Sequence, residues 1–262
     1  MVNAFQFAVG NEPLPIVGPN LERAVLLLAL LRAALRDGTV VAPSFNGIAL
    51  SLNRPRETVR RAGLGLVDLG LCVKSVRGIR LAPDFLDRPD MRLLRARVLR
   101  LFFVLLDRFE WSGFALPKDA RAVSEDASVV AALDIYLSVF ELTESRMSEP
   151  IVLHVLAAVT VGNAARIVDH PVLAMRYGYA ETVPPDELRV PISLKSVVAL
   201  SGLPYSTLWR HAVALEKAGL LRKTAGGYLL GDIFMDSAQT SARSVEKIKY
   251  VRRVLHDLAS GR

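Results

Sequence analysis

Apolar residues recur every three to four positions along most of the chain, which predicts a mainly helical protein. Long helices are expected over residues 20–36, 91–110, 124–145, 148–168 and 242–258. Asn20, Ser124 and Pro150 stand at or near the starts of three of these helices, and all three are residue types that begin helices.

Two stretches break this helical pattern because they are rich in proline. Residues 1–19 contain three prolines, and we expect an irregular N-terminal arm there. Residues 169–191 contain four prolines and are expected to be irregular, with a short helix near Met175.

Two further stretches, residues 44–87 and 193–236, combine short helical patterns with short alternating ones. We call them the first segment and the second segment. When the chain is aligned with itself at an offset of 149 residues, 12 of these 44 positions are identical, Pro55/Pro204 and Gly70/Gly219 among them. The matches fall on caps, turns and apolar positions, so both segments are expected to share one fold. The sequence therefore predicts a tandem duplication.

Each segment begins with a helix-turn-helix pattern. In the second segment, Ser193 is placed to cap a short helix, Gly202 ends it, and Pro204 begins another helix. In the first segment, Ser44 matches the cap and Asn53 stands at the place of Gly202. Gly and Asn are the residues that best accept a left-handed backbone, which a three-residue turn between crossed helices requires.

A β-hairpin is expected after the second helix of each segment. Gly219 ends that helix in the second segment, an apolar pair begins a strand, and a basic turn containing glycine leads into another strand. Gly70 and the residues up to Leu81 repeat this order in the first segment. Two helices followed by a hairpin make a helix-turn-helix with a wing.

The run from Leu203 to Leu221 resembles the winged helix-turn-helix transcription regulators of the MarR and IclR type in its Ser-Thr, Arg and Leu-Glu-Lys-x-Gly-Leu spacing. The first segment departs from that pattern with Arg56 and Glu57 before Thr58, and Pro55 and Pro204 stand where the family commonly has a capping Ser or Thr. The resemblance implies a mainly α fold with small β-wings, in which tandem duplicated winged helix-turn-helix domains are joined by long helices.

The expected domain order follows from these elements. It comprises an N-terminal arm (residues 1–19), a first winged-helix domain with flanking helices (20–118), connecting helices (119–168), and a second winged-helix domain with a C-terminal helix (169–262).

The distribution of charge favours an anionic partner. The chain has a formal net charge of +7, and residues 44–82 alone carry seven Arg or Lys against two acidic residues. Residues 118–149 are acidic instead, with three basic and seven acidic side chains. Basic side chains gathered on a helix-turn-helix are typical of phosphate binding.

We expect double-stranded DNA to contact basic, aromatic and hydroxyl side chains of the second helices and hairpins: Arg54, Arg56, Arg60, Arg61, Lys74, Arg77, Arg80, Tyr205, Ser206, Thr207, Trp209, Arg210, Arg222 and Lys223. Base reading is expected from Arg56, Arg60, Tyr205, Ser206 and Trp209. Arg61 and Arg210, which occur in both segments, are expected to position phosphates. The alternative for Trp209 is packing against a neighbouring domain, and for the arginines simple solvation.

Other classes of function find little support in the sequence. The four histidines are scattered, no metal-ligand spacing or phosphate-binding glycine loop occurs, and we expect neither catalysis nor a cofactor. Cys72 matches Leu221 of the second segment, so a buried core thiol is favoured over a redox sensor. No apolar run reaches about 20 residues, so no membrane span is expected. We expect a cytoplasmic, nucleoid-associated protein.

Sequence-specific DNA binding as a bacterial-type transcription regulator is the leading functional hypothesis. A plasmid-type replication initiator and a winged-helix protein–protein scaffold without DNA binding are the alternatives. The long helices have three candidate roles. They either cover the two winged modules, form a homodimer interface, or enclose a pocket for an unspecified small-molecule effector lined by Tyr136, His154 or Met175.

Overall fold

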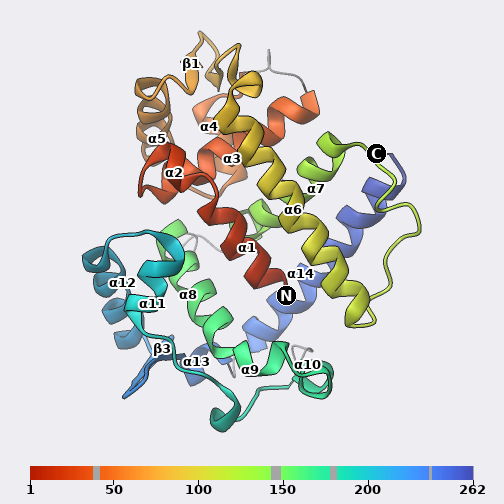
Figure 1. Ribbon diagram of the computed structural model, residues 1–262. Helices are drawn as coiled ribbons and strands as arrows, with labels where there is room; N and C mark the ends of the chain where they lie inside the picture. Colours follow the sequence, from red (N-terminus) through yellow and green to blue (C-terminus); the bar gives the residue numbers. More distant parts are fainter. Residues whose placement is uncertain (38–41, 143–148, 178–181, 236–237, 262) are drawn as a thin grey trace.

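A computed structural model describes residues 1–37, 42–142, 149–177, 182–235 and 238–261 of the chain. The protein is mainly helical and carries two small antiparallel sheets of two strands each (Figure 1). The helices are α1 (Val2–Asn11), α2 (Leu14–Val17), α3 (Leu21–Asp37), α4 (Phe45–Ser51), α5 (Arg56–Asp68), α6 (Pro89–Trp111), α7 (Glu125–Glu141), α8 (Pro150–Asn163), α9 (Ala165–Val168), α10 (Pro171–Tyr177), α11 (Leu194–Ser201), α12 (Tyr205–Lys217), α13 (Asp232–Met235) and α14 (Ala238–Ala259). The strands are β1 (Cys72–Lys74), β2 (Ile79–Leu81), β3 (Leu221–Thr224) and β4 (Gly227–Leu230), and short 3₁₀ turns cover Phe85–Asp87 and Asp186–Leu188.

The long helices α3, α6, α7, α8 and α14 pack with α1 around one continuous hydrophobic core. Helix α7 lies at its centre and contacts α3, α6 and α14. The expected starts of two long helices are confirmed, because Asn20 Oδ1 accepts from the Arg23 N–H at 3.1 Å and Ser124 Oγ accepts from the Ala127 N–H at 3.2 Å. Buried side chains of this core come from all the expected domains.

The N-terminal arm is not irregular, as the sequence analysis expected, but contains α1. Its prolines lie only at residues 13–19, so nothing interrupts a helix over Val2–Asn11. Phe5 and Val9 lie four residues apart on one helical face and are buried in the core. Burial of this face offsets the short length of the helix.

The helix expected over residues 148–168 divides at Ala164 into α8 and α9. Asn163, the last residue of α8, is buried and binds the hairpin of the second segment. Its Nδ2 donates to Tyr228 O at 3.1 Å, and its Oδ1 accepts from the Leu230 N–H at 2.8 Å. The end of α8 is therefore fixed to β4.

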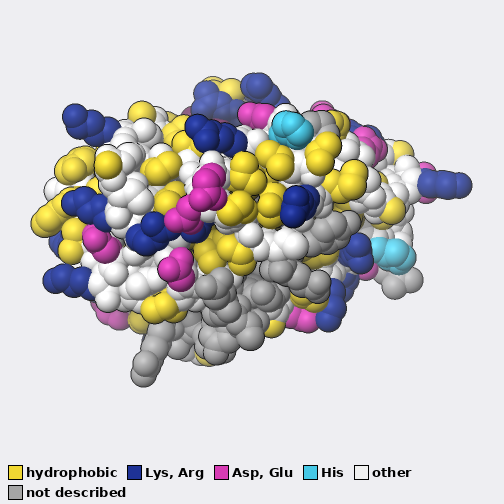
Figure 2. Space-filling model, turned by 90° about the horizontal axis from the view of Figure 1, so that it is seen from below, with side chains coloured by type: hydrophobic (Ala, Val, Ile, Leu, Met, Phe, Trp, Pro, Cys, Tyr) yellow, Lys and Arg dark blue, Asp and Glu magenta, His cyan; other side chains and the backbone are white. Residues whose placement is uncertain are grey.

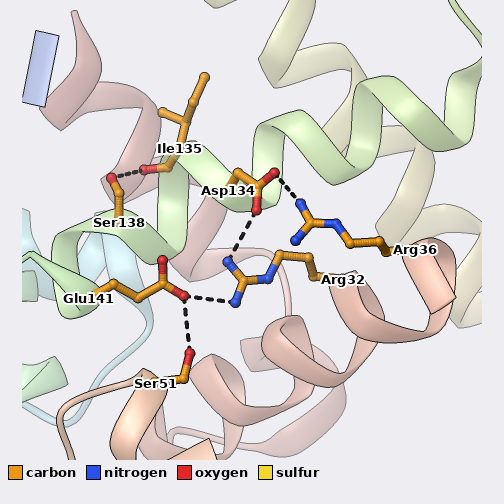
Figure 3. Close-up of polar contacts among 7 residues, drawn as sticks. All are labelled: Arg32, Arg36, Ser51, Asp134, Ile135, Ser138 and Glu141. Carbon is orange, nitrogen blue, oxygen red and sulfur yellow. Dashed lines mark hydrogen bonds and ion pairs between the residues drawn. The ribbon is translucent and has the colours of Figure 1, made fainter. Parts of the chain in front are cut away.

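A polar cluster joins α3 and the end of α4 to the central helix α7 (Figure 3). Arg32 of α3 donates to Asp134 at 3.1 Å and to Glu141 at 2.7 Å, both on α7. Arg36 donates to the other oxygen of Asp134 at 2.6 Å, and Ser51 at the end of α4 donates to Glu141 at 3.3 Å. Two arginines against two carboxylates leave this part-buried cluster balanced in charge.

In the part of the chain that the structure describes, no single helix is long and apolar enough to cross a membrane, and only the bent pair Val2–Val17 and Leu21–Asp37 passes that test together.

Candidate nucleic-acid interface

The first helices and turns of the two segments share a serine cap and a left-handed turn residue. Ser44 Oγ accepts from the Gly47 N–H at 3.0 Å, and Ser193 Oγ accepts from the Ser196 N–H at 3.1 Å. In the turns that follow, Asn53 has φ 51° and Gly202 has φ 65°. Each segment therefore has the expected capped helix, a left-handed residue in the turn, and a second helix after it.

The helix ends also agree between the segments. Gly70 and Gly219 end α5 and α12 with φ of 68° and 71°. The next residue donates back to a carbonyl five positions earlier in both cases, Leu71 to Leu66 at 3.0 Å and Leu220 to Leu215 at 2.9 Å. These paired bonds stand 149 residues apart, as in the sequence alignment.

Each hairpin is bonded to the chain just before its own segment. The Ile79 N–H donates to Pro43 O at 3.2 Å, and the Tyr228 N–H donates to Ile192 O at 2.9 Å. The glycines before them, Gly78 and Gly227, lie so close that an added Cβ would stand 2.0 and 2.2 Å from those oxygens. Glycine is thus required at the same point of both hairpins.

A long helix supports each segment from the same side. Helix α3 packs against α5 and β2, and α8 packs against α12 and β4. Helices α3 and α8 also pack against the central helices. The two segments lie at opposite ends of the core (Figure 1). In Figure 1, α5 and α12 lie along the same side of the molecule, with β1 at one end of that side and β3 at the other.

Most of the basic candidates in the first segment face solvent. Arg56, Arg60 and Arg61 of α5 are exposed, as are Lys74 and Arg77 in the hairpin. The Arg80 side chain is half-buried on β2.

Two exposed arginines of α5 already have an acidic partner. Arg60 donates to both oxygens of Glu57 at 2.8 Å, and Arg61 stands 3.8 Å from the same carboxylate. The hydrogen bond from Arg60 lowers the pKa of Glu57, which stays charged. Arg56 is the cation of this helix that no described carboxylate contacts within ion-pair distance.

Arg54 does not belong to the exposed surface, contrary to the sequence-based assignment. Its side chain is 8% exposed and forms an ion pair with Glu22 of α3. Its counterpart in the second segment is Leu203, which is 2% exposed. The alignment with a buried leucine was the signal that Arg54 points inward, and its burial is compensated by Glu22.

The second segment exposes a different set of side chains. Tyr205 and Trp209 of α12 are each 51% exposed, and Ser206 and Arg210 beside them are also exposed. Trp209 therefore leaves half of its surface in solvent. Thr207 is half-buried.

The hairpin of the second segment carries one exposed lysine and one engaged arginine. Lys223 is exposed. Arg222 forms an ion pair with Asp186, which also binds the buried Arg189. Both hydrogen bonds lower the pKa of Asp186, so a charged partner holds Arg222 against the protein.

The end of the molecule near β3 and α10 shows no single basic patch. Figure 2 shows Lys and Arg side chains scattered among hydrophobic and acidic ones on this face.

Two remaining features concern cysteine and metals. Cys72 is 2% exposed in β1, and burial raises the pKa of its thiol to about 12, as expected of a core residue. Within the described ranges, no group of three His, Cys, Asp or Glu side chains is arranged to hold a metal ion.

Comparison with known proteins returns no match to any family model, curated protein or solved structure.

Proposed function

We propose that the two segments are duplicated winged helix-turn-helix modules and that the protein binds double-stranded DNA sequence-specifically, as a cytoplasmic, nucleoid-associated transcription regulator. One observation carries the proposal. Each segment has a capped first helix, a left-handed turn residue and a hairpin bonded to the residue before the segment, and each exposes polar side chains of its second helix. The two second helices, α5 and α12, lie along the same side of the molecule in Figure 1.

The geometry suits a groove-reading helix in each segment. An α-helix fits the major groove. The exposed side chains near the starts of the two helices include Arg56, Glu57 and Arg60 of α5, and Tyr205, Ser206 and Trp209 of α12. Lys74 and Lys223 stand at equivalent hairpin positions, where a cation reaches the phosphate backbone. Two linked modules raise the effective concentration of the second at its half-site.

The test begins with selection of binding sites from random double-stranded DNA, followed by fluorescence anisotropy with the enriched duplex at several salt concentrations. The variant is R56Q/R61Q, which removes two exposed cations of α5. The matched control is R92Q/R100Q, which removes two exposed cations of α6, a helix outside both segments.

We expect R56Q/R61Q to weaken binding at least tenfold and to lower the slope of log K against log salt by about 1–2, since each phosphate contact contributes about 0.9. The control R92Q/R100Q is expected to keep most of the DNA affinity and most of the salt slope. Absence of an enriched motif, or an equal effect of the two variants, would overturn the proposal.

A protein–protein scaffold remains a second candidate for one region, the second segment. Leu200 of α11 is 52% exposed, and Tyr205 and Trp209 of α12 are each 51% exposed. Exposed aromatic and aliphatic side chains of this kind anchor protein interfaces. If selection finds no DNA motif and Y205A/W209A abolishes capture of a specific protein, the scaffold is favoured.

A further inference from the structure

A cavity of about 400 Å³ lies among α1, α7, α8 and α14, outside the surface considered above. This size is within the range of sites for small organic molecules. Its walls are mainly apolar and include Phe7, Phe140, Leu153 and Leu156. Tyr136 and His154 line it, as one sequence-based hypothesis expected, whereas Met175 does not and is 73% exposed.

Lys247 of α14 provides a cation in this apolar wall. Its Nζ donates to Asn3 Oδ1 at 2.8 Å and to Gln6 Oε1 at 3.2 Å, which uses two of its three protons. Among the described residues, no carboxylate lies within ion-pair distance of it. Burial lowers the pKa of Lys247 to about 8, so the ammonium form still predominates at pH 7.

His154 of α8 adds a second unsatisfied group to the same cavity. The residue is 6% exposed, its ring stands against Phe7 at 4.6 Å, and its buried Nε2 has no hydrogen-bond partner. Burial lowers its pKa to about 4, so the ring is neutral at pH 7 and can donate one N–H. A buried polar atom without a partner costs free energy, which a ligand atom would recover.

We propose that this cavity binds a small apolar molecule that carries one carboxylate. The carboxylate would supply the missing counter-charge to Lys247 and accept a hydrogen bond from its ammonium group. It would also accept a hydrogen bond from the Nε2 of His154. The apolar remainder would pack against the aromatic and leucine side chains of the walls. A cationic or an uncharged molecule would leave Lys247 without its counter-charge.

The place of the cavity gives such a ligand a route to the second segment. Helix α8 carries His154 into the cavity, packs against α12, and ends at Asn163, which binds β4. Phe234, just after β4, also lines the cavity. An effect on DNA would rest on the proposed function, but binding itself does not depend on it.

The experiment is isothermal titration calorimetry of the full chain with decanoate, compared with decanol and decylamine. We expect decanoate to bind at least tenfold more tightly than either. K247M is expected to lose at least tenfold in decanoate affinity and to keep its decanol affinity. The control K249M removes an exposed lysine, which pairs with Glu246 on the same helix, and is expected to behave like the unaltered protein.

The pH dependence gives an independent readout. Among the described residues, the titratable groups that face or line the site with Lys247 are Tyr136, His154, Glu246 and the amino group of Met1. Tyr136 keeps its proton because burial raises its pKa, and His154 stays neutral above pH 6. Decanoate affinity should therefore fall about tenfold per pH unit above about pH 8, as Lys247 loses its proton.

Equal binding of decanoate and decanol, an unchanged K247M, or a flat pH profile between pH 7 and 10 would overturn the site. Because no DNA enters these titrations, failure here is distinguishable from failure of DNA binding.

Discussion

The first and second segments share several backbone features but present different chemistry to solvent. Where α5 exposes Arg56 and Arg60, α12 exposes Tyr205 and Trp209 at the matching positions. The backbone hydrogen bonds at the ends of α5 and α12, the left-handed turn residues and the glycine of the hairpin stay the same. Inward-facing residues and turn residues determine the backbone features that the two segments share. The outward-facing residues are therefore free to differ.

One inward position differs as well. Arg54 and Leu203 occupy the same buried place after the turn, and only the arginine needs a partner, which is Glu22. The same frame therefore accepts either an apolar side chain or a buried ion pair.

The variants with the largest expected effect test whether the two hairpins depend on the same backbone contact. G78A and G227A should each lower the free energy of unfolding by about 3 kcal/mol or more, because the new Cβ would stand 2.0 or 2.2 Å from a backbone oxygen. Urea unfolding followed by circular dichroism measures this. G47A serves as the control, since its Cβ would meet only the Ser44 hydroxyl at 3.2 Å. If only one of the two variants lowers the free energy of unfolding, the two hairpins are not equivalent.

A smaller effect is expected at the buried position that differs. R54L leaves Glu22 part-buried without its partner and should cost about 2 kcal/mol at pH 7. Replacing both residues, R54L/E22L, should restore most of that loss, because the second segment already has leucine there.

The same variant has a predictable pH dependence. Burial already raises the pKa of Glu22, and loss of Arg54 removes the interaction that opposes this rise. A carboxyl with a raised folded pKa gains stability as it becomes protonated, so the deficit of R54L should shrink as the pH falls from 7 towards 4. DNA affinity and its salt slope should not change, since Arg54 is not exposed. If the stability loss of R54L grows at low pH, or if its DNA binding has a lower salt slope, Arg54 belongs to the DNA-binding surface after all.

The smallest effect concerns the outward chemistry. W209A should weaken DNA binding about tenfold, equal to about 1.4 kcal/mol, through lost apolar contact with bases. Its salt slope should stay unchanged, whereas R56Q/R61Q should lower the slope. Fluorescence anisotropy at four salt concentrations measures the salt slope of each variant and so distinguishes W209A from R56Q/R61Q. A reduced slope for W209A would show that both segments bind phosphates in the same way.

Much of the frame was predictable because its signals are local. Ser44, Ser193, Asn53 and Gly202 act on residues within a few positions of themselves, and each has the expected role. The irregular arm was a wrong prediction, because prolines at residues 13–19 say nothing about the ten residues before them. The duplication and its DNA-binding role stay predictions.

The candidate site was less predictable. Exposure of Arg56, Arg61 and Trp209 followed from helical periodicity. The engagement of Arg222 by Asp186, 36 residues away, did not, since no pattern pairs a hairpin arginine with a distant turn.

The sequence by itself determined where the caps, turns and hairpins lie, since those depend on backbone preferences of neighbouring residues. Tertiary structure alone decided which cations stay free and how the cavity is lined. Lys247 meets Asn3 and Gln6 across more than 240 residues, and only packing brings such positions together. The physical reason is that conformational preference acts along the chain, whereas burial and charge pairing act through space.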